Sequence, residues 1–278
     1  MSGTRFTDIR HFDTVDSTNR YLLAEARSGA ADGVVAVAEF QTAGRGRLGR
    51  RWEAPSGSNL LMSVLLRPEL GPEQRHLAST ALCLAAAEAV ERAVGVVLAV
   101  KWPNDLLGPD GRKVAGVLAE ADVAGVPVGA DVASRTLPAV VVGIGINVNW
   151  PVDDNDLAPD LVGVAGSLHR LTGRSVDRAG LLAGLLEALD RRADQLGTAA
   201  GRARLVTDLR SGCATIGAEV RVEQEGGGFV GRAVDLTPDG HLVVEADGGL
   251  RTVLAGDVVH LRPRGGDGSA PGPGRTRL

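Results

Sequence analysis

The feature that most constrains the fold is a valine-rich run that leads into a loop of glycines and arginines. Residues 34–41 (VVAVAEFQ) are mostly apolar and rich in valine, which predicts a buried β-strand. Residues 43–51 then hold four arginines and three glycines. Glycines allow sharp turns and close approach of the backbone to a ligand, and arginines present planar forks of N–H donors. We therefore expect a strand that delivers an anion-binding loop.

Other interpretations of this loop are weaker. Gly44, Gly46 and Gly49 have the spacing of the dinucleotide-binding fingerprint, but that fingerprint requires a helix directly after the glycines. Residues 52–58 (WEAPSGS) are rich in turn formers and have no helical period, which excludes it. The Gly-Lys-Ser/Thr sequence of phosphate-loop NTPases is absent. The alternative that stays open is a solvated loop, because basic runs usually face water.

The composition limits the class of protein. The chain has 278 residues, of which 44% are apolar, so it can form one large domain and a small one. Its net charge of −4 means that the basic character is local, which suits a small anionic ligand better than nucleic acid. No signal peptide and no membrane-spanning run is visible. Cys83 and Cys213 are predicted to be buried thiols in a reducing cytoplasm, and the five histidines form no zinc-binding pattern.

Lysine is rare in this chain. The chain contains only two lysines, Lys101 and Lys113, and 28 arginines. The two lysines lie within thirteen residues of each other. This placement suggests a need for a compact ammonium charge, which an arginine does not provide, although chance is an alternative.

The two lysines flank a predicted turn. Pro103 prevents the strand predicted over residues 96–102 from continuing, so Asn104 and Asp105 are placed at a turn. A second turn at residues 108–111 (GPDG) predicts a hairpin that draws Lys113 back toward that strand end. An ordinary turn aspartate is the alternative for Asp105.

The remaining elements surround these motifs. Residues 1–13 predict a short strand with Phe12 inward, and Asp16-Ser17-Thr18-Asn19 predicts the start of a helix that ends at Gly29. Plain N-capping is one interpretation of this run, but one cap needs one side chain, so hydroxyls and an amide are expected to be free to bind a ligand. Further predicted elements are a strand over 59–66, a helix over 72–94, a glycine-interrupted strand over 139–149, a leucine-rich helix capped by Ser175 and a helical piece over 201–209.

The pattern changes near residue 211. Five short alternating segments predict a small β-barrel: 218–222, 229–234, 241–245, 250–254 and 256–261. Residues 123–138 are predicted to be a surface loop, and the Gly/Pro-rich end of the chain to be disordered. We therefore expect three regions: a ligand-binding domain over 1–210, a barrel over 211–263 and a disordered tail over 264–278.

Taken together, these segments resemble the biotin–protein ligase family. The motifs, in the family's order, are residues 16–19 (DSTN), 41–50 (QTAGRGRLGR), 101–105 (KWPND), 112–116 (RKVAG) and 143–147 (GIGIN). The resemblance implies an α/β (α+β) fold, with a mixed-sheet, class II synthetase-like catalytic domain and a small C-terminal SH3-like β-barrel. It implies that biotin and ATP give biotinyl-5′-AMP and pyrophosphate. A lysine of a biotin carboxyl carrier domain then takes the biotinyl group.

The resemblance also assigns roles to residues. For catalysis it implies Lys113 between the carboxylate and the α-phosphate, Arg47 on the phosphate and Asp105 beside the incoming lysine amine. The residues implied for biotin are Ser17, Thr18, Asn19, Gln41, Gly44, Arg45, Gly46, Arg47, Lys113 and Gly116. Those implied for ATP are Arg45, Arg47, Arg50, Trp52, Asn104, Lys113 and Asn147, with Arg51 as an outer helper. A structural amide is the alternative for Asn147. No metal ligand is assigned, and Mg²⁺ would arrive with ATP.

Partners and rivals follow from the same resemblance. We expect a carrier domain of a biotin-dependent carboxylase as partner. We expect no binding to DNA, because only fifteen residues precede Asp16, and no binding to a membrane. We also expect a monomer or a weak homodimer. The rival functions are a lipoate–protein ligase and a non-catalytic module that binds nucleotide or carrier. The loop GRGRLGR favours biotin over lipoate, and Lys113 beside that loop argues against the non-catalytic module.

Overall fold

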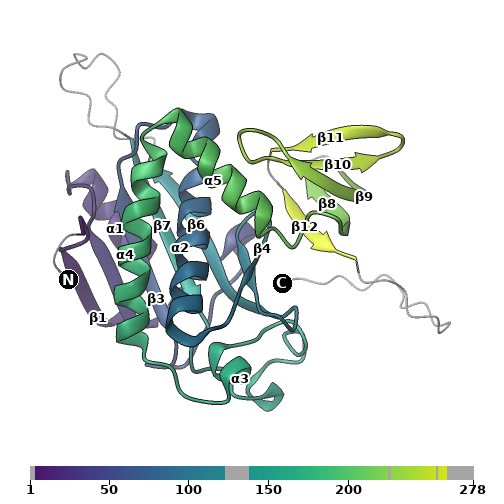
Figure 1. Ribbon diagram of the computed structural model, residues 1–278. Helices are drawn as coiled ribbons and strands as arrows, with labels where there is room; N and C mark the ends of the chain where they lie inside the picture. Colours follow the sequence, from purple (N-terminus) through teal and green to yellow (C-terminus); the bar gives the residue numbers. More distant parts are fainter. Residues whose placement is uncertain (1–3, 123–137, 225–226, 255, 262–278) are drawn as a thin grey trace, which may run out of the picture.

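The computed structural model describes residues 4–122, 138–224, 227–254 and 256–261. Its first part contains both strands and helices (Figure 1). Their bounds are β1 Ile9–Val15, α1 Thr18–Arg27, β2 Val35–Gln41, β3 Leu60–Leu66, α2 Leu77–Val94, β4 Ala99–Lys101, β5 Asp105–Leu107, β6 Lys113–Asp122, β7 Ala139–Ile146, α3 Leu168–Thr172, α4 Arg178–Leu196 and α5 Ala199–Ser211. The second part comprises β8 Glu219–Gln224, β9 Gly227–Leu236, β10 Leu242–Ala246, β11 Gly249–Val253 and β12 Asp257–His260.

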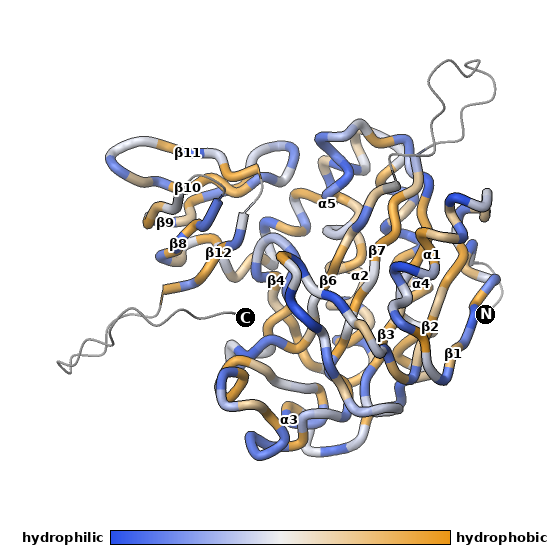
Figure 2. The backbone as a smooth tube through the Cα atoms, turned by 180° about the vertical axis from the view of Figure 1, so that it is seen from behind, coloured by the Kyte–Doolittle hydropathy of each residue, from blue (hydrophilic) through white to orange (hydrophobic). Residues whose placement is uncertain are grey.

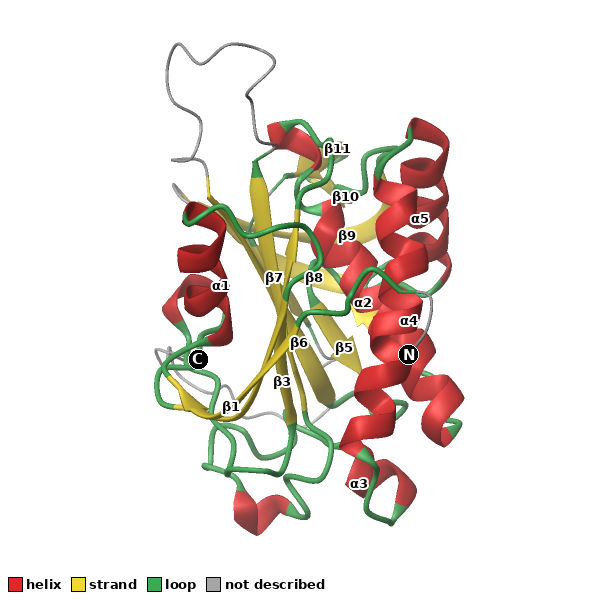
Figure 3. Ribbon diagram, turned by 90° about the vertical axis from the view of Figure 1, so that its left-hand side faces the viewer, coloured by secondary structure: helices red, strands yellow, loops and turns green. Residues whose placement is uncertain are grey.

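A mixed seven-stranded sheet forms the centre of the molecule. Its strand order is β1-β2-β3-β7-β6-β5-β4, with β1 and β2 parallel and the other neighbours antiparallel. Helix α1 covers one face, and α2, α4 and α5 cover the other (Figure 3). The predicted α/β class with a mixed sheet is therefore confirmed.

The core lies on both faces of this sheet. All seven residues of β3 are buried, and apolar strands β3 and β7 run through the middle of the sheet (Figure 2). Between the sheet and its outer helices lies the main apolar cluster, and a smaller cluster around Leu22 and Leu65 lies under α1. A strand buried on both faces reads as a continuous apolar run, which is why the sequence marked β3 clearly.

The helices follow their predicted patterns with shifted ends. Helix α2 buries eleven of its residues, among them Cys83, and closes at Gly95 with φ of 73°, as the sequence predicted. Residues 72–74 form a separate short 3₁₀ turn. Helix α4 is capped by Asp177 and not by the predicted Ser175, because the Asp177 carboxylate accepts the Ala179 N–H. The hydroxyl of Ser175 instead contacts Asn149.

Other predictions need correction. The strand predicted over 96–102 shrinks to the three residues of β4, because a turn begins at Trp102. Cys213 is only partly buried, and Phe12 is partly buried against Tyr21, while the fully buried Phe6 escaped the sequence analysis. Most of the loop predicted over 123–138 and the tail from 264 lie outside the described residues. Within the described part, no helix is long and apolar enough to cross a membrane.

The five predicted C-terminal strands are confirmed as an antiparallel sheet of order β11-β10-β9-β8-β12. This C-terminal sheet contacts the first part at several points (Figure 1). The indole Nε1 of Trp102 donates to the carbonyl of Gly240 at 3.0 Å, and the His76 ring approaches the carbonyl of Asp239 at 2.8 Å. The His76 ring also stacks on His241, with 4.5 Å between their centroids. The domain limits at 210 and 263 stay a prediction.

Replacing Leu185 in the core tests the packing between α2 and α4. Leu185 is fully buried, so Leu185→Ala should lower the free energy of unfolding in urea by about 2–5 kcal/mol through lost burial and a residual cavity. Glu187 is exposed on the same helix, and Glu187→Ala should change it by less than about 0.5 kcal/mol. Equal losses for the two variants would contradict this account of the core.

Candidate active site

Glycines form a bare strip on the face of the sheet that α1 covers. Gly143 and Gly145 of β7 lie on this strip, with Gly116 of β6 paired to Gly145. A Cβ atom at Gly143 would overlap the side chain of Asn19, and one at Gly145 would overlap the indole of Trp52. Glycine is therefore required here by close approach of side chains to the backbone. The two glycines in this strand were a sequence signal for such an approach.

A buried polar network lies at one end of the strip. The Oγ1 of Thr18 lies 3.1 Å from Gln41 Oε1 and 2.6 Å from Ser63 Oγ. Asn19 accepts from Ser63 Oγ at 2.6 Å and donates to the carbonyl of Leu118 at 3.2 Å. Ser17 alone caps α1, by accepting the Arg20 N–H. The neighbouring hydroxyl of Thr18 and amide of Asn19 do not cap the helix, but they already have partners within the protein, so the expectation that they are free to bind a ligand stays a prediction.

A carboxylate that the sequence analysis missed closes this network. Glu120 accepts from Asn19 Nδ2 at 2.8 Å and forms an ion pair with Arg45. Arg45 therefore lies at the Asn19 end of the strip, paired to β6. The only sequence signal for Glu120 is an acidic residue directly after the apolar run of residues 114–119.

The arginine loop folds back on itself. The N–H of Trp52 donates to the carbonyl of Gly44 at 3.0 Å, and that of Gly46 to Arg50 at 2.8 Å. Leu48 and Gly49 both adopt positive φ at the tip, and only a short 3₁₀ turn, Arg47–Gly49, follows. The absence of a helix after these glycines agrees with the exclusion of the dinucleotide fingerprint.

Trp52 leaves the loop and lies over the glycine strip. Its ring contacts the position of Gly145, and the Lys113 ammonium lies 5.5 Å from the ring centroid. Its indole Nε1 is buried and has no hydrogen-bond partner among the described residues. Buried donors are normally paired, so this N–H is an unsatisfied donor among the described residues of the site.

Lys113 and Asp105 form an ion pair beside Trp52. The Lys113 Nζ lies 2.7 Å from Asp105 Oδ1. The hairpin β5–β6 produces this contact, as the sequence predicted. In the hairpin β4–β5, Lys101 lies opposite Asp105 in the strand register. The N–H of Lys113 donates to the carbonyl of Val164, and the N–H of Gly166 donates to the carbonyl of Lys113, which fixes the position of Lys113 in the strand.

Arg47 differs from the other cations of the site, because its partners are neutral. Its guanidinium donates to Asn104 Oδ1 at 3.1 Å and to the carbonyl of Gly256 at 2.9 Å. Among the described residues no carboxylate pairs with it. Burial lowers the pKa of Arg47, while the nearby charges of Asp257 and Asp105 raise it. This positive charge is thus positioned but not neutralised by a direct ion pair.

The other residues predicted for the site, Arg50, Arg51 and Asn147, each have a different partner. Arg50 pairs with Asp257 of β12, so the C-terminal sheet holds the arginine loop, whereas Arg51 is exposed and pairs with Glu53 at 3.1 Å. Asn147 is buried and fully engaged: it accepts from Asn59 at 3.2 Å and donates to the Gly166 carbonyl at 2.9 Å. Its surroundings fit the structural alternative, and its role toward ATP stays a prediction.

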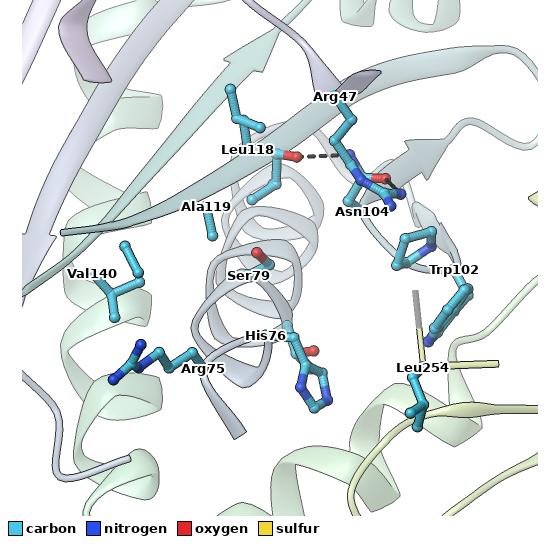
Figure 4. Close-up of a pocket in the computed structure, with 14 residues that line it drawn as sticks. Arg47, Arg75, His76, Ser79, Trp102, Asn104, Leu118, Ala119, Val140 and Leu254 are labelled. Atoms are coloured by element: carbon cyan, nitrogen blue, oxygen red, sulfur yellow. Dashed lines mark hydrogen bonds between the residues drawn. The ribbon is translucent and has the colours of Figure 1, made fainter. Parts of the chain in front are cut away.

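A pocket of about 310 Å³ borders the site at Arg47 and Asn104. Figure 4 shows these two side chains at its upper rim, with Trp102 and Leu254 on one side and His76 at the base. It lies past the end of short strand β5, where part of β6 has no strand neighbour on this side. The arrangement can therefore hold two anionic groups near Lys113 and Arg47, with an open approach beside them.

Filling the glycine strip should displace Trp52. A Cβ atom at Gly145 has no room beside the indole, so Gly145→Ala should move the ring out and raise quenching of tryptophan fluorescence by acrylamide. Gly184→Ala in α4 is the matched control, because its added Cβ meets nothing closer than 4.0 Å. Unchanged quenching in Gly145→Ala would show that Trp52 does not lie on the strip.

Comparison with known proteins places the chain in a family. The sequence model of the biotin/lipoate A/B protein ligase family matches residues 11–147, and that of the biotin protein ligase C-terminal domain matches residues 215–261. The biotin–[acetyl-CoA-carboxylase] ligase of Mycobacterium tuberculosis is 41% identical over 270 residues, which cover 94% of this chain and 91% of the relative. The bifunctional ligase/repressor BirA of Bacillus subtilis is 30% identical over 248 residues, covering 89% and 72%.

Solved structures agree with this. The biotin protein ligase of Aquifex aeolicus in complex with biotin and ATP superposes with a TM-score of 0.75 at 27% identity, over 93% of this chain and all of that one. The extent and identity of these matches, and the confirmed motifs around Lys113 and Arg47, lead to one conclusion. The chain belongs to the biotin protein ligase family.

Proposed function

We propose that the chain activates biotin with ATP to biotinyl-5′-AMP and then transfers the biotinyl group to a lysine of a biotin carboxyl carrier domain. The observation that carries this proposal is the positioned charge of Arg47 next to the Lys113–Asp105 pair. Relatives named as biotin ligases, and one solved with biotin and ATP, support it.

In the first step an oxygen of the biotin carboxylate attacks the α-phosphorus of ATP, and pyrophosphate leaves. Both reactants are anionic and repel each other unless cations lie between them. Lys113 exchanges Asp105 for the carboxylate and the α-phosphate, which its flexible stem permits. Arg47 gains its first anionic partner when phosphate binds, because its present partners are neutral. Attraction to the transferring group therefore does not require Arg47 to break an existing ion pair.

The ring system of biotin fits the polar end of the glycine strip. The ureido group is neutral, with N–H donors and a carbonyl, and Ser17, Thr18, Asn19 and Gln41 offer hydroxyls and amides that match it. Gly116 has no side chain, so the backbone can approach the ring, as Lys113 and Trp52 already approach this position. Gly44 and Gly46 let the arginine loop turn close to the ligand, and Arg45 reaches the same end through its pair with Glu120.

The adenylate is assigned to the other end. Trp52 carries a buried, unpaired N–H there, Asn104 orients Arg47, and Arg50 reaches the phosphates if it leaves Asp257. Arg45 and Asn147 stay in this assignment only through the family resemblance. Mg²⁺ enters as part of the ATP substrate. The carboxylates of Asp105 and Asp257 are already paired with cations, which fits a metal delivered by the nucleotide.

In the second step the amine of the carrier lysine attacks the carbonyl carbon of biotinyl-5′-AMP, an amide bond forms and AMP leaves. The amine must lose a proton to act as a nucleophile. Asp105 is the carboxylate next to Lys113, and it becomes free when Lys113 turns to the phosphate. We assign it the task of orienting and deprotonating the amine.

The setting of this activity is also proposed. The partner is a carrier domain of a biotin-dependent carboxylase, in line with the relatives named as biotin–[acetyl-CoA-carboxylase] ligases. We propose a cytoplasmic enzyme, monomeric or weakly dimeric, that does not bind DNA. The lipoate ligase alternative finds no support in the names of these relatives.

Removing either central cation should stop adenylate formation. Lys113→Ala and Arg47→Ala should each lower the biotin-dependent release of pyrophosphate from ATP by at least about 100-fold, since each stabilises charge in the transition state. Arg92→Ala, which removes an exposed arginine of α2 with a weak pair at 3.9 Å, should leave it unchanged. Full activity in Lys113→Ala would refute the assigned role, and no activity with biotin in the wild type would refute the function.

Asp105→Asn should affect transfer more than activation. With biotinyl-5′-AMP supplied in a single turnover, mass spectrometry of the carrier domain should show biotinyl transfer slowed by about 10²-fold or more, as expected for loss of a general base. Pyrophosphate release should fall by a smaller factor, because Lys113 and Arg47 are retained. A loss confined to pyrophosphate release would exclude the proposed role in deprotonation.

A further inference from the structure

The turn that carries Asn104 and Asp105 is attached to a buried hydroxyl outside the known motifs. The N–H of Trp102 donates to Thr215 Oγ1 at 2.9 Å, and His260 Nε2 lies 2.9 Å from the same oxygen. Thr215 is fully buried and lies between α5 and β8, while His260 ends β12. One hydroxyl thus joins the catalytic turn to the C-terminal sheet.

The segment around Thr215 is fixed along the edge of the large sheet. Val100 of β4 donates to the Gly212 carbonyl at 2.8 Å, and Ala214 donates to the Val100 carbonyl at 2.9 Å. Because β4 is the last strand of the sheet, these bonds continue its ladder with the linker to the C-terminal sheet. Thr215 is therefore held rigidly enough to position what it binds.

The turn also holds the two cations, Arg47 and Lys113, in position. Asn104 holds Arg47 at 3.1 Å and is itself held by the Val117 carbonyl at 2.7 Å. Asp105 holds Lys113 at 2.7 Å. Movement of the turn at Trp102 would shift both cations on which activation depends.

We propose that Thr215 is a positioning residue for biotin activation: its buried hydroxyl fastens the Trp102–Asp105 turn to His260 and so keeps Arg47 and Lys113 in place. This inference rests on the proposed function, and it gives the C-terminal sheet a task in the first step. Thr215 touches neither biotin nor ATP, and it acts through Asn104 and Asp105.

The chemistry of the hydroxyl sets the protonation state of His260. A threonine hydroxyl has one proton to donate and two lone pairs, and Trp102 already donates to one lone pair. Among the described residues, His260 Nε2 is the remaining polar partner of this hydroxyl, and a neutral imidazole that accepts at Nε2 satisfies the hydroxyl proton. Protonated His260 would face the hydroxyl with a second donor and leave its proton unpaired in the interior, which is unfavourable.

The surroundings of His260 favour the neutral ring. Burial is the largest cause that lowers the pKa of His260; Lys101 lowers it further and Asp105 opposes this. On the neighbouring strand, His260 pairs with buried Val220, and the exposed side chains of Glu219 and Arg221 alternate to the other face. A lowered pKa in the folded state means that the unfolded state binds the proton more readily. The contribution of neutral His260 to the stability of the folded state is therefore complete above the unfolded pKa of about 6.5. It is lost as the pH falls through the pKa of the folded state.

Conservative variants of Thr215 test the proposal. Thr215→Val keeps the shape but removes the hydroxyl, and it should lower kcat of biotin-dependent pyrophosphate release by about 10- to 100-fold, the effect of misplaced reacting groups. The KM for biotin should change by less than about threefold, because the turn does not touch the Thr18–Asn19 end. Thr215→Ser should restore most of the activity. Thr207→Val, an exposed position in α5, is the matched control.

A pH profile separates positioning from simple support of the fold. As the pH falls below about 6.5 and through the lowered folded pKa of His260, the wild type should lose activity as His260 takes up a proton, whereas His260→Gln should keep an acceptor and lose less over the same range. A rescue by serine together with this flattened acid limb would support the proposal. Activity of Thr215→Val within about twofold of wild type, loss that serine does not restore, or equal acid limbs would each overturn it. A wild type without biotin-dependent pyrophosphate release would instead refute the proposed function itself.

Discussion

The site depends on bringing positive charges together without letting them repel each other or bind their own carboxylates too tightly. Three of its cations have acidic partners: Lys113 has Asp105 in the same hairpin, and Arg45 and Arg50 have Glu120 and Asp257 from distant parts of the chain. Arg47 is held by neutral oxygens of Asn104 and Gly256 instead. Such an arrangement neutralises three of the positive charges of the site and leaves the charge of Arg47 for phosphate. The paired cations must exchange partners when the anionic substrates enter, and this exchange links binding to the order of the two steps.

The glycine strip provides the second constraint. Because Gly143 and Gly145 have no side chains, Asn19 and Trp52 reach the surface of the sheet itself. The polar network and Arg45 lie at one end and Lys113 lies toward the other, and the distance between them is set by strand register. Side chains placed on the strands of a rigid sheet are held more precisely than side chains on loops.

The C-terminal sheet contributes contacts that hold this site in place. Its carbonyl at Gly256 and its carboxylate at Asp257 hold the arginine loop. Its carbonyl at Gly240 and its His260 hold the turn after β4, the latter through Thr215. Both groups of contacts end at residues that orient Arg47. Loss of the C-terminal sheet would therefore release the phosphate-binding side of the site even if the large sheet stayed folded.

The sequence by itself determined the elements and the local part of the site. Apolar runs marked the buried strands, turn residues marked their ends, and the hairpin after Asp105 brought Lys113 back to it, because residues joined by a short turn meet whatever the rest of the chain does. Only the tertiary structure decided that Arg45 meets Glu120, 75 residues away, and that Arg50 meets Asp257, 207 residues away. Such contacts depend on sheet order, on register and on how the C-terminal sheet packs. No local pattern encodes these, because each follows from the summed packing of many distant residues.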